Sequence, residues 1–374
     1  MYLPSIITDA IYKRIKPFVT LLLLTISLGA FAQPDSTAGS YFIDARLHGG
    51  FLIAHRPSLV PLQQNHLLGF DVSAGIFTNG SQAWHRFYNY PSLGLKYIFL
   101  QTGNADMLGN AHALVPFFDV NFTKRHKTKF GLQFGWGVGY VTKKYTQYDN
   151  YKNAAIGSGF NSTPCINFFV RKRIADKNYL SAGIGVTHFS NGSVVTPNLG
   201  INLATANICY RFSGGDKKPI ERNVEQSVSK KWEKSIALVF GVKQNYPAIG
   251  PDFFITQLSL LAMRQFKPVS AYGLGVDLLH DPSITQRLDN RGAITDDFTP
   301  FRPGVNASYS FKMGNLTMLV QQGFYVYSQL TDDGILYQRL GLRYHVKKRY
   351  FAAFNLKTHF AKADFFEWGG GVMF

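Results

Sequence analysis

The chain has 374 residues, a formal net charge of +17 and 15% aromatic residues, a length that allows one large domain or two small ones. Its basic charge raises nucleic-acid binding as a first possibility. However, the basic residues gather mostly in short turns, such as Lys124–Lys127 and Lys347–Arg349. Because such turns suit anionic lipid headgroups at membrane edges, we expect no nucleic-acid partner.

The first 32 residues have the features of a secretory signal peptide. A charged start holds Lys13, Arg14 and Lys16, and the apolar run 18–28 follows it. Ala30-Phe31-Ala32 then supplies the small residues of a cleavage site. The apolar run is shorter than a membrane-spanning helix requires. We therefore predict an exported chain.

From Tyr41 onward, the residues alternate between large apolar positions and small or polar ones. The clearest case is the segment 130–140, whose apolar positions are Phe130, Leu132, Phe134, Trp136, Val138 and Tyr140. This period of two, with aromatic residues on many strands, is typical of strands that face lipid in a transmembrane β-barrel. A soluble β-sandwich has the same period and stays open as an alternative. We predict an all-β protein, a transmembrane antiparallel β-barrel of the bacterial outer membrane.

Two cysteines, Cys165 and Cys209, fall on the inward positions of their predicted strands. One strand lies between them, so we expect their backbones to be about 10 Å apart. That separation is too large for a relaxed disulfide. We therefore predict that both are free packing residues, and no metal-binding spacing surrounds them.

The segment 180–190 continues the alternation, but its apolar face ends in polar residues. His188 and Ser190 share the parity of Leu180, Ala182, Ile184 and Val186. A turn centred near Thr196 then places Asn202 roughly opposite Ser190. Polar groups on a lipid-facing surface are costly unless they are paired or used. The pattern allows a serine–histidine hydrolase site that faces a lipid substrate, or a polar strand end at a membrane interface.

A polar, charged stretch divides the chain into two parts, and we count about eight strands on either side of it. With both ends periplasmic, the hairpin 188–202 falls at the outer rim. One barrel of about sixteen strands stays open as an alternative to two units in tandem. The predicted parts are a signal peptide at 1–32, an eight-stranded barrel at 33–213, a periplasmic linker at 214–234 and a second eight-stranded unit at 235–374.

The second unit contains an echo of this hairpin, Thr358-His359-Phe360-Ala361. There the outward parity belongs to Phe354 and Leu356, which turns His359 inward. Alanine also takes the place of the serine. We therefore predict that the second unit is not catalytic.

His-Phe-Ser-Asn-Gly at 188–192, followed by Pro-Asn-x-Gly-Ile at 197–201, resembles the signature of the PagL-type lipid A 3-O-deacylases, or acyloxyacyl hydrolases. The resemblance covers roughly residues 1–213. It implies an eight-stranded barrel with a His–Ser–Glu triad on its outer wall. His188 matches the general base and Ser190 the nucleophile, while Asn198, with Asn191 beside it, matches the oxyanion support. The glutamate of the family falls at Asn202, where this chain departs from the pattern.

We therefore expect a serine ester hydrolase of the Gram-negative outer membrane that needs no cofactor, calcium or other metal. Its expected partner is lipid A, lipopolysaccharide or another acylated lipid. Asn202 can orient the His188 ring but supplies no negative charge, and losing the acid of such a triad can cost about 10⁴-fold in rate. Asp149 in the preceding loop is an alternative acid. A structural barrel with weak or no catalysis, a porin-like channel and a homodimer all stay open.

Overall fold

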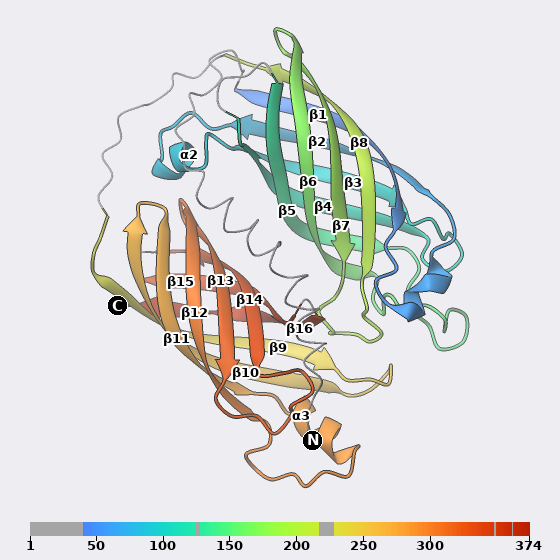
Figure 1. Ribbon diagram of the computed structural model, residues 1–374, viewed down its shortest axis with the longest axis vertical. Coiled ribbons are helices and arrows are strands. Elements are labelled where there is room, and N and C mark those ends of the chain that lie inside the picture. Colours follow the sequence, from blue (N-terminus) through green and yellow to red (C-terminus); the bar gives the residue numbers. More distant parts are fainter. Residues whose placement is uncertain (1–39, 124–127, 217–227, 348, 361) are drawn as a thin grey trace, which may run out of the picture.

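The computed structural model describes residues 40–374 apart from 124–127, 217–227, 348 and 361. The predicted signal at 1–32 and the basic turn Lys124–Lys127 therefore lie outside the described residues. Within these residues, strands β1 to β16 form two closed antiparallel barrels, which Figure 1 shows in blue to green and in yellow to red. The all-β tandem prediction is confirmed. The alternative of one barrel of about sixteen strands is wrong, because β8 returns to pair with β1 and β16 returns to pair with β9.

The first barrel is built from consecutive strands, each paired with its neighbour along the chain. A short 3-10 helix, η1 (Pro57–Leu62), follows β1, and a short helix, α2 (Ala83–Phe87), follows β2. The strands are β1 (Tyr41–Leu52), β2 (Leu67–Phe77), β3 (Ser92–Gln101), β4 (Asn110–Asn121), β5 (Thr128–Val141), β6 (Phe160–Ala175), β7 (Asn178–Phe189) and β8 (Ile201–Gly214).

The second barrel repeats this up-and-down order, with one helix, α3 (Ser283–Asp289), in the loop after β11. In the part of the chain that the structure describes, no helix has the length and apolar character to cross a membrane. The strands are β9 (Trp232–Gln244), β10 (Asp252–Lys267), β11 (Ser270–His280), β12 (Phe301–Met313), β13 (Leu316–Tyr325), β14 (Leu336–His345), β15 (Tyr350–His359) and β16 (Lys362–Met373).

The alternation of residue types decides which side chains face outward. In β5, Phe130 and Val138 are 51% and 60% exposed, whereas Gln133 between them is 1% exposed. The first barrel is therefore apolar outside and polar inside, as lipid-facing barrels are. The interior polar groups pair with one another: Arg211 lies 2.6 Å from Asp44 and 2.8 Å from Asp119. Cys165 and Cys209 are buried and free, as expected.

The two rims of each barrel differ in the lengths of the connections that they carry. The rim that holds the 190–200 connection, which we call the hairpin rim, also holds 53–66, 102–109 and 142–159 in the first barrel. The opposite rim has the short turn 176–177, but it also carries the longer connection 78–91 with α2. In the second barrel, 281–300 and 326–335 lie on the rim equivalent to the hairpin rim, beside the short connection 360–361.

The two barrels contact each other at both rims. At the hairpin rim, the Gln244 backbone N–H donates to Ser193 O at 2.8 Å, and the Thr196 N–H donates to Gln244 Oε1 at 3.0 Å. At the opposite rim, the Tyr88 hydroxyl donates to Val269 O at 3.3 Å. Equivalent rims therefore meet, so the second barrel stands against the hairpin with the same orientation across a membrane.

Candidate active site

His188 is the last but one residue of β7, and its partner across the ladder is Asn202 of β8. The predicted pairing of Asn202 with Ser190 is therefore wrong by two residues. The connection 190–200 centres on residue 195, one position before the expected turn centre, Thr196. Moving a turn centre by one residue moves each pairing by two, which leaves every side chain on its expected face.

The outward orientation of this face agrees with the exposure of its neighbours. Ile184 and Leu180, which share the parity of His188, are 65% and 45% exposed, whereas Thr187 is buried. Ser190 follows the strand and forms an isolated antiparallel bridge with Ser162 of β6. Side chains opposite each other in such a bridge share a face. Ser190 therefore faces outward too, yet it is only 4% exposed because neighbouring chain covers it.

A chain of hydrogen bonds holds the His188 ring. Its Nδ1 lies 2.6 Å from Asn202 Oδ1, and Asn202 Nδ2 lies 2.9 Å from His55 Nδ1. His55 Nε2 in turn lies 3.1 Å from Leu199 O. With both rings neutral, these bonds place the His55 proton on Nε2 and the His188 proton on Nδ1. His188 Nε2 is then the unprotonated nitrogen, as a general base requires.

His55 is a site residue that the sequence did not reveal. It lies three residues past the end of β1, in the connection 53–66. Closure of the barrel brings it to the hairpin, since the Ile53 backbone N–H donates to Asn202 O at 2.8 Å. No local spacing relates positions 55 and 202, so only knowledge that β1 pairs with β8 could have indicated it.

Asn191 and Asn198, both in the connection 190–200, differ in how their side-chain amides are hydrogen-bonded. The Asn191 amide group is occupied, because Nδ2 donates to Ser158 Oγ at 2.8 Å and to Val195 O at 2.9 Å. Asn198 Oδ1 accepts the Asn191 backbone N–H at 3.0 Å. Asn198 Nδ2 is shielded from solvent and has no hydrogen-bond partner among the described residues. An unsatisfied buried donor is costly, so this N–H is the group that a developing oxyanion can use.

Two glycines allow the hairpin to pack as it does. Gly200 has φ +83°, and a Cβ there would lie 2.5 Å from His188 Cε1, so a side chain would displace the ring. Gly192 has φ +61°, and a Cβ there would overlap the Phe366 ring of the second barrel. Both positions favour glycine because of the backbone angle and because of the close neighbour.

Two expected contacts are absent from the described residues. No hydrogen bond joins His188 to Ser190, although both face outward from neighbouring positions. Asp149 is exposed in the connection 142–159, and no hydrogen bond or ion pair links it to His188. The partner of the histidine is therefore the neutral Asn202, and the geometry gives no support to Asp149 as the acid.

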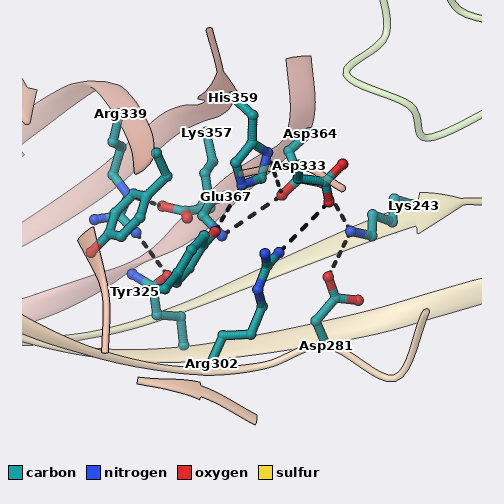
Figure 2. A network of polar contacts seen from close by, with 12 residues as sticks. Lys243, Asp281, Arg302, Tyr325, Asp333, Arg339, Lys357, His359, Asp364 and Glu367 are labelled. Carbon is teal, nitrogen blue, oxygen red and sulfur yellow. Dashed lines mark hydrogen bonds and ion pairs between the residues drawn. The ribbon is translucent and has the colours of Figure 1, made fainter. Parts of the chain in front are cut away.

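The echo in the second barrel points inward, as its parity predicted. His359 is 6% exposed, its Nε2 lies 2.9 Å from the Tyr325 hydroxyl, and its Nδ1 lies 3.7 Å from Asp364 Oδ2. Figure 2 shows this ring among charged side chains of the barrel interior, where Lys243 contacts both Asp364 and Asp281. His359 is therefore a member of an internal polar network, away from the lipid-facing wall.

Two family models match the chain, one on each barrel. The lipid A 3-O-deacylase (PagL) model matches residues 68–211, and the model of the acyloxyacyl hydrolase C-terminal domain matches residues 232–374. A search of the curated proteins found no match.

A comparison with solved structures gives matches of low identity and low TM-score. Neisserial surface protein A is 11% identical and the outer membrane enzyme PagL 18% identical, with TM-scores of 0.34 and 0.30, and each match covers 99% of that chain and 47% or 46% of this one. A mutant of the Rh. blastica porin is 10% identical over 90% of this chain and 99% of the porin, with a TM-score of 0.19. By these two matches, residues 68–211 belong to the lipid A 3-O-deacylase (PagL) family and residues 232–374 to the acyloxyacyl hydrolase C-terminal domain family.

Proposed function

We propose that the hairpin 188–202 is the active site of a serine ester hydrolase that removes an acyl chain from lipid A or a related acylated lipid. The observation that carries this proposal is the hydrogen bond of 2.6 Å between His188 Nδ1 and Asn202 Oδ1 on the lipid-facing wall. It holds the ring with Nε2 free, two residues from a serine on the same face. The substrate class follows from the family and from the position of this face, which would meet the membrane lipid.

The reaction divides into two transfers of the acyl group. His188 Nε2 takes the Ser190 proton while the serine oxygen attacks the ester carbonyl carbon. The resulting oxyanion accepts the Asn198 Nδ2–H, which has no other partner among the described residues. The carbonyl re-forms, the bond to the leaving alcohol breaks, and His188 returns its proton to that alcohol. Water then attacks the acyl-serine by the same route and releases the fatty acid.

The Ser190 hydroxyl must reach His188 for this reaction. Catalytic hydrogen bonds are often long or absent in free enzymes and form when the substrate binds. The backbones of both residues are held, His188 by its ladder pairing with Asn202 and Ser190 by its bridge to Ser162. A bound substrate would therefore bring the hydroxyl to the base by rotation of the Ser190 side chain.

Asn202 replaces a carboxylate with a neutral amide. Its Oδ1 still fixes the His188 tautomer, and its own orientation is held by His55 at 2.9 Å. The imidazolium that forms during the reaction receives only a dipole, which stabilises it less than a full charge does in a medium of low dielectric. We therefore expect a slower enzyme than one with an acid at this position, with His55 acting as a positioning residue.

A porin-like channel finds less support, because charged side chains fill the barrel interiors. In the second barrel, Arg339 contacts Asp277 at 3.1 Å and Glu367 at 2.8 Å, and Arg339 and Glu367 are 2% and 1% exposed (Figure 2). In the first barrel, Arg211 is 1% exposed. A water-filled pore would expose such groups.

Mass spectrometry of lipopolysaccharide vesicles incubated with the purified, folded chain tests the proposal. We expect wild-type protein to release fatty acid, and Ser190→Ala to reduce the release at least about 10³-fold. Ser73→Ala is the matched control, because it removes a hydroxyl from the interior of the same barrel. Equal release by wild type and Ser190→Ala would exclude the serine mechanism. Release by neither protein would favour a structural barrel.

A further inference from the structure

A groove of about 450 Å³ lies between the two barrels, beside the hairpin. Trp136, Val138 and Phe160 of the first barrel line one wall, and Leu342, Phe354 and Phe366 of the second barrel line the other. Its volume falls in the range of roughly 300–1,000 Å³ that small-molecule sites have. Every one of these six side chains is apolar or aromatic, so the groove is suited to hydrocarbon.

The walls of the groove come from the lipid-facing sides of both barrels. The Trp136 and Phe354 rings meet edge to face with centroids 5.6 Å apart, and Phe354 stacks on Phe366 at 5.3 Å. Phe160 and Val138 remain 71% and 60% exposed, so the groove opens toward the membrane. A lipid chain could therefore enter it from the side without crossing water.

The groove also has polar lining residues, Asn191, Ser158 and Ser162, and one of them is paired with the proposed nucleophile. Ser162 and Ser190 exchange backbone hydrogen bonds of 2.8 and 3.1 Å and share a face of the sheet. Side chains paired in this way lie about 5 Å apart at Cβ. The lining of the groove therefore reaches the residue directly across the sheet from Ser190.

We propose that this groove binds the acyl chain of the ester that Ser190 cleaves, so that the second barrel supplies half of the substrate site. This inference rests on the proposed function and assigns a role to a barrel that has no catalytic hairpin of its own. The occupant is an acyl chain of a membrane lipid, since the groove is apolar, opens to the bilayer and is lined by Ser162, the residue paired with Ser190.

The second barrel also supports the hairpin itself. Gln244 bonds to Ser193 O and to the Thr196 N–H, and Phe366 packs on Gly192. The same barrel therefore fixes the position of the hairpin and shapes the groove beside it.

The first experiment measures how activity depends on acyl-chain length. Leu342→Trp should fill the groove, while Val320→Trp places the same large side chain at an exposed position of β13 that is not part of it. The substrates are p-nitrophenyl myristate and p-nitrophenyl butyrate in detergent micelles. Each buried methylene contributes about 0.8 kcal/mol, so displacing two of them changes affinity about tenfold. We expect Leu342→Trp to lower the myristate-to-butyrate ratio of kcat/KM at least about tenfold, Leu342→Phe to lower it less, and Val320→Trp to leave it unchanged.

The second experiment reads binding without catalysis. A myristoyl ester that carries a diazirine at the methyl end is photolysed with the full-length Ser190→Ala protein, and the labelled residues are identified by mass spectrometry. We expect labelling of Phe354 and Phe366 above that of Val320, and Leu342→Trp in the Ser190→Ala background should remove this excess. Equal labelling of both faces, or an unchanged chain-length ratio in a correctly folded Leu342→Trp protein, would overturn the groove. Loss of hydrolysis in Ser190→Ala tests the proposed function separately.

Discussion

The two barrels contain almost the same tetrapeptide, and they place it on opposite faces. The histidine of Thr187-His188-Phe189-Ser190 lies among the outward residues of β7, whereas the histidine of Thr358-His359-Phe360-Ala361 is the last residue of β15 and lies among its inward residues. His188 bonds to a neutral amide on the outer wall, and His359 bonds to Tyr325 within a charged interior. The face of the strand on which a histidine lies, rather than the motif around it, therefore decides whether that histidine can contact lipid.

The surroundings of each histidine follow from its face. An interior histidine can join the ion pairs that fill a barrel, and His359 has Asp364 and Lys357 as neighbours. A histidine on the outer wall has to be satisfied by nearby polar groups, which for His188 are its ladder partner Asn202 and, through Asn202, His55 of the connection 53–66. The first arrangement stabilises a fold, and the second leaves one ring nitrogen free for chemistry.

Removing His188 or His359 in turn should give the largest difference in the rate of ester hydrolysis. We expect His188→Ala to lower ester hydrolysis at least about 10³-fold, because the serine loses its base. His359→Ala should leave the rate unchanged and reduce stability by about 1–3 kcal/mol, since the buried Tyr325 hydroxyl loses its partner. Hydrolysis of a lipid ester and urea unfolding in detergent measure the two effects. If His359→Ala abolished hydrolysis while the barrels remained folded, the comparison between the faces would be incorrect.

Replacing Asn202, the neutral partner of His188, with glutamate tests how much the missing negative charge limits catalysis at the outer wall. Asn202→Glu restores a negative partner for His188 and should raise hydrolysis about ten- to a hundredfold, less than the roughly 10⁴-fold value of the acid in an established serine–histidine–aspartate triad. The gain is smaller because a carboxylate on an outward face also loses hydration. The assay compares wild type, Ser190→Ala, Asn202→Glu and the double variant on one lipid ester.

Ser190→Ala should abolish activity in both of these backgrounds. Equal residual rates in all four proteins would mean that the hairpin is not catalytic. The structural-barrel interpretation would then replace the hydrolase.

Removing the remote member of the hydrogen-bond chain should have the smallest effect. We expect His55→Ala to lower kcat about two- to tenfold, which corresponds to one hydrogen bond of about 0.5–1.5 kcal/mol, and to alter the pH profile of kcat. His55→Gln offers an oxygen to Asn202 Nδ2 and should restore part of the rate. His112→Ala on β4 is the control, since His112 bonds to Tyr97 away from the hairpin. A pH profile identical to that of the wild type would limit His55 to a structural role.

The sequence was sufficient to predict which face of a strand each side chain occupies, and it indicated the hairpin 188–202 as the candidate site. A period of two is a local property, so the outward parity of His188 and the inward parity of His359 could be predicted without any tertiary information. The strand count and the polar stretch between the halves favoured two barrels in tandem but left one barrel of about sixteen strands open, and the structure decided between them. Cys165 and Cys209 were correctly expected to be free for the same reason, because strand spacing is regular.

The contacts that depend on closure of the barrel and on loop geometry could be found only from the tertiary structure. Pairing of β1 with β8 brings His55 to Asn202, and a turn centred on residue 195 moves the partner of Asn202 from Ser190 to His188. Packing of the second barrel then places Phe366 on Gly192 beside the hairpin. These contacts join residues far apart in the chain, and a strand register or a barrel–barrel interface has no signature in local alternation. These contacts could not be predicted because alternation along a strand specifies only the face of a side chain, whereas long-range packing selects its neighbour.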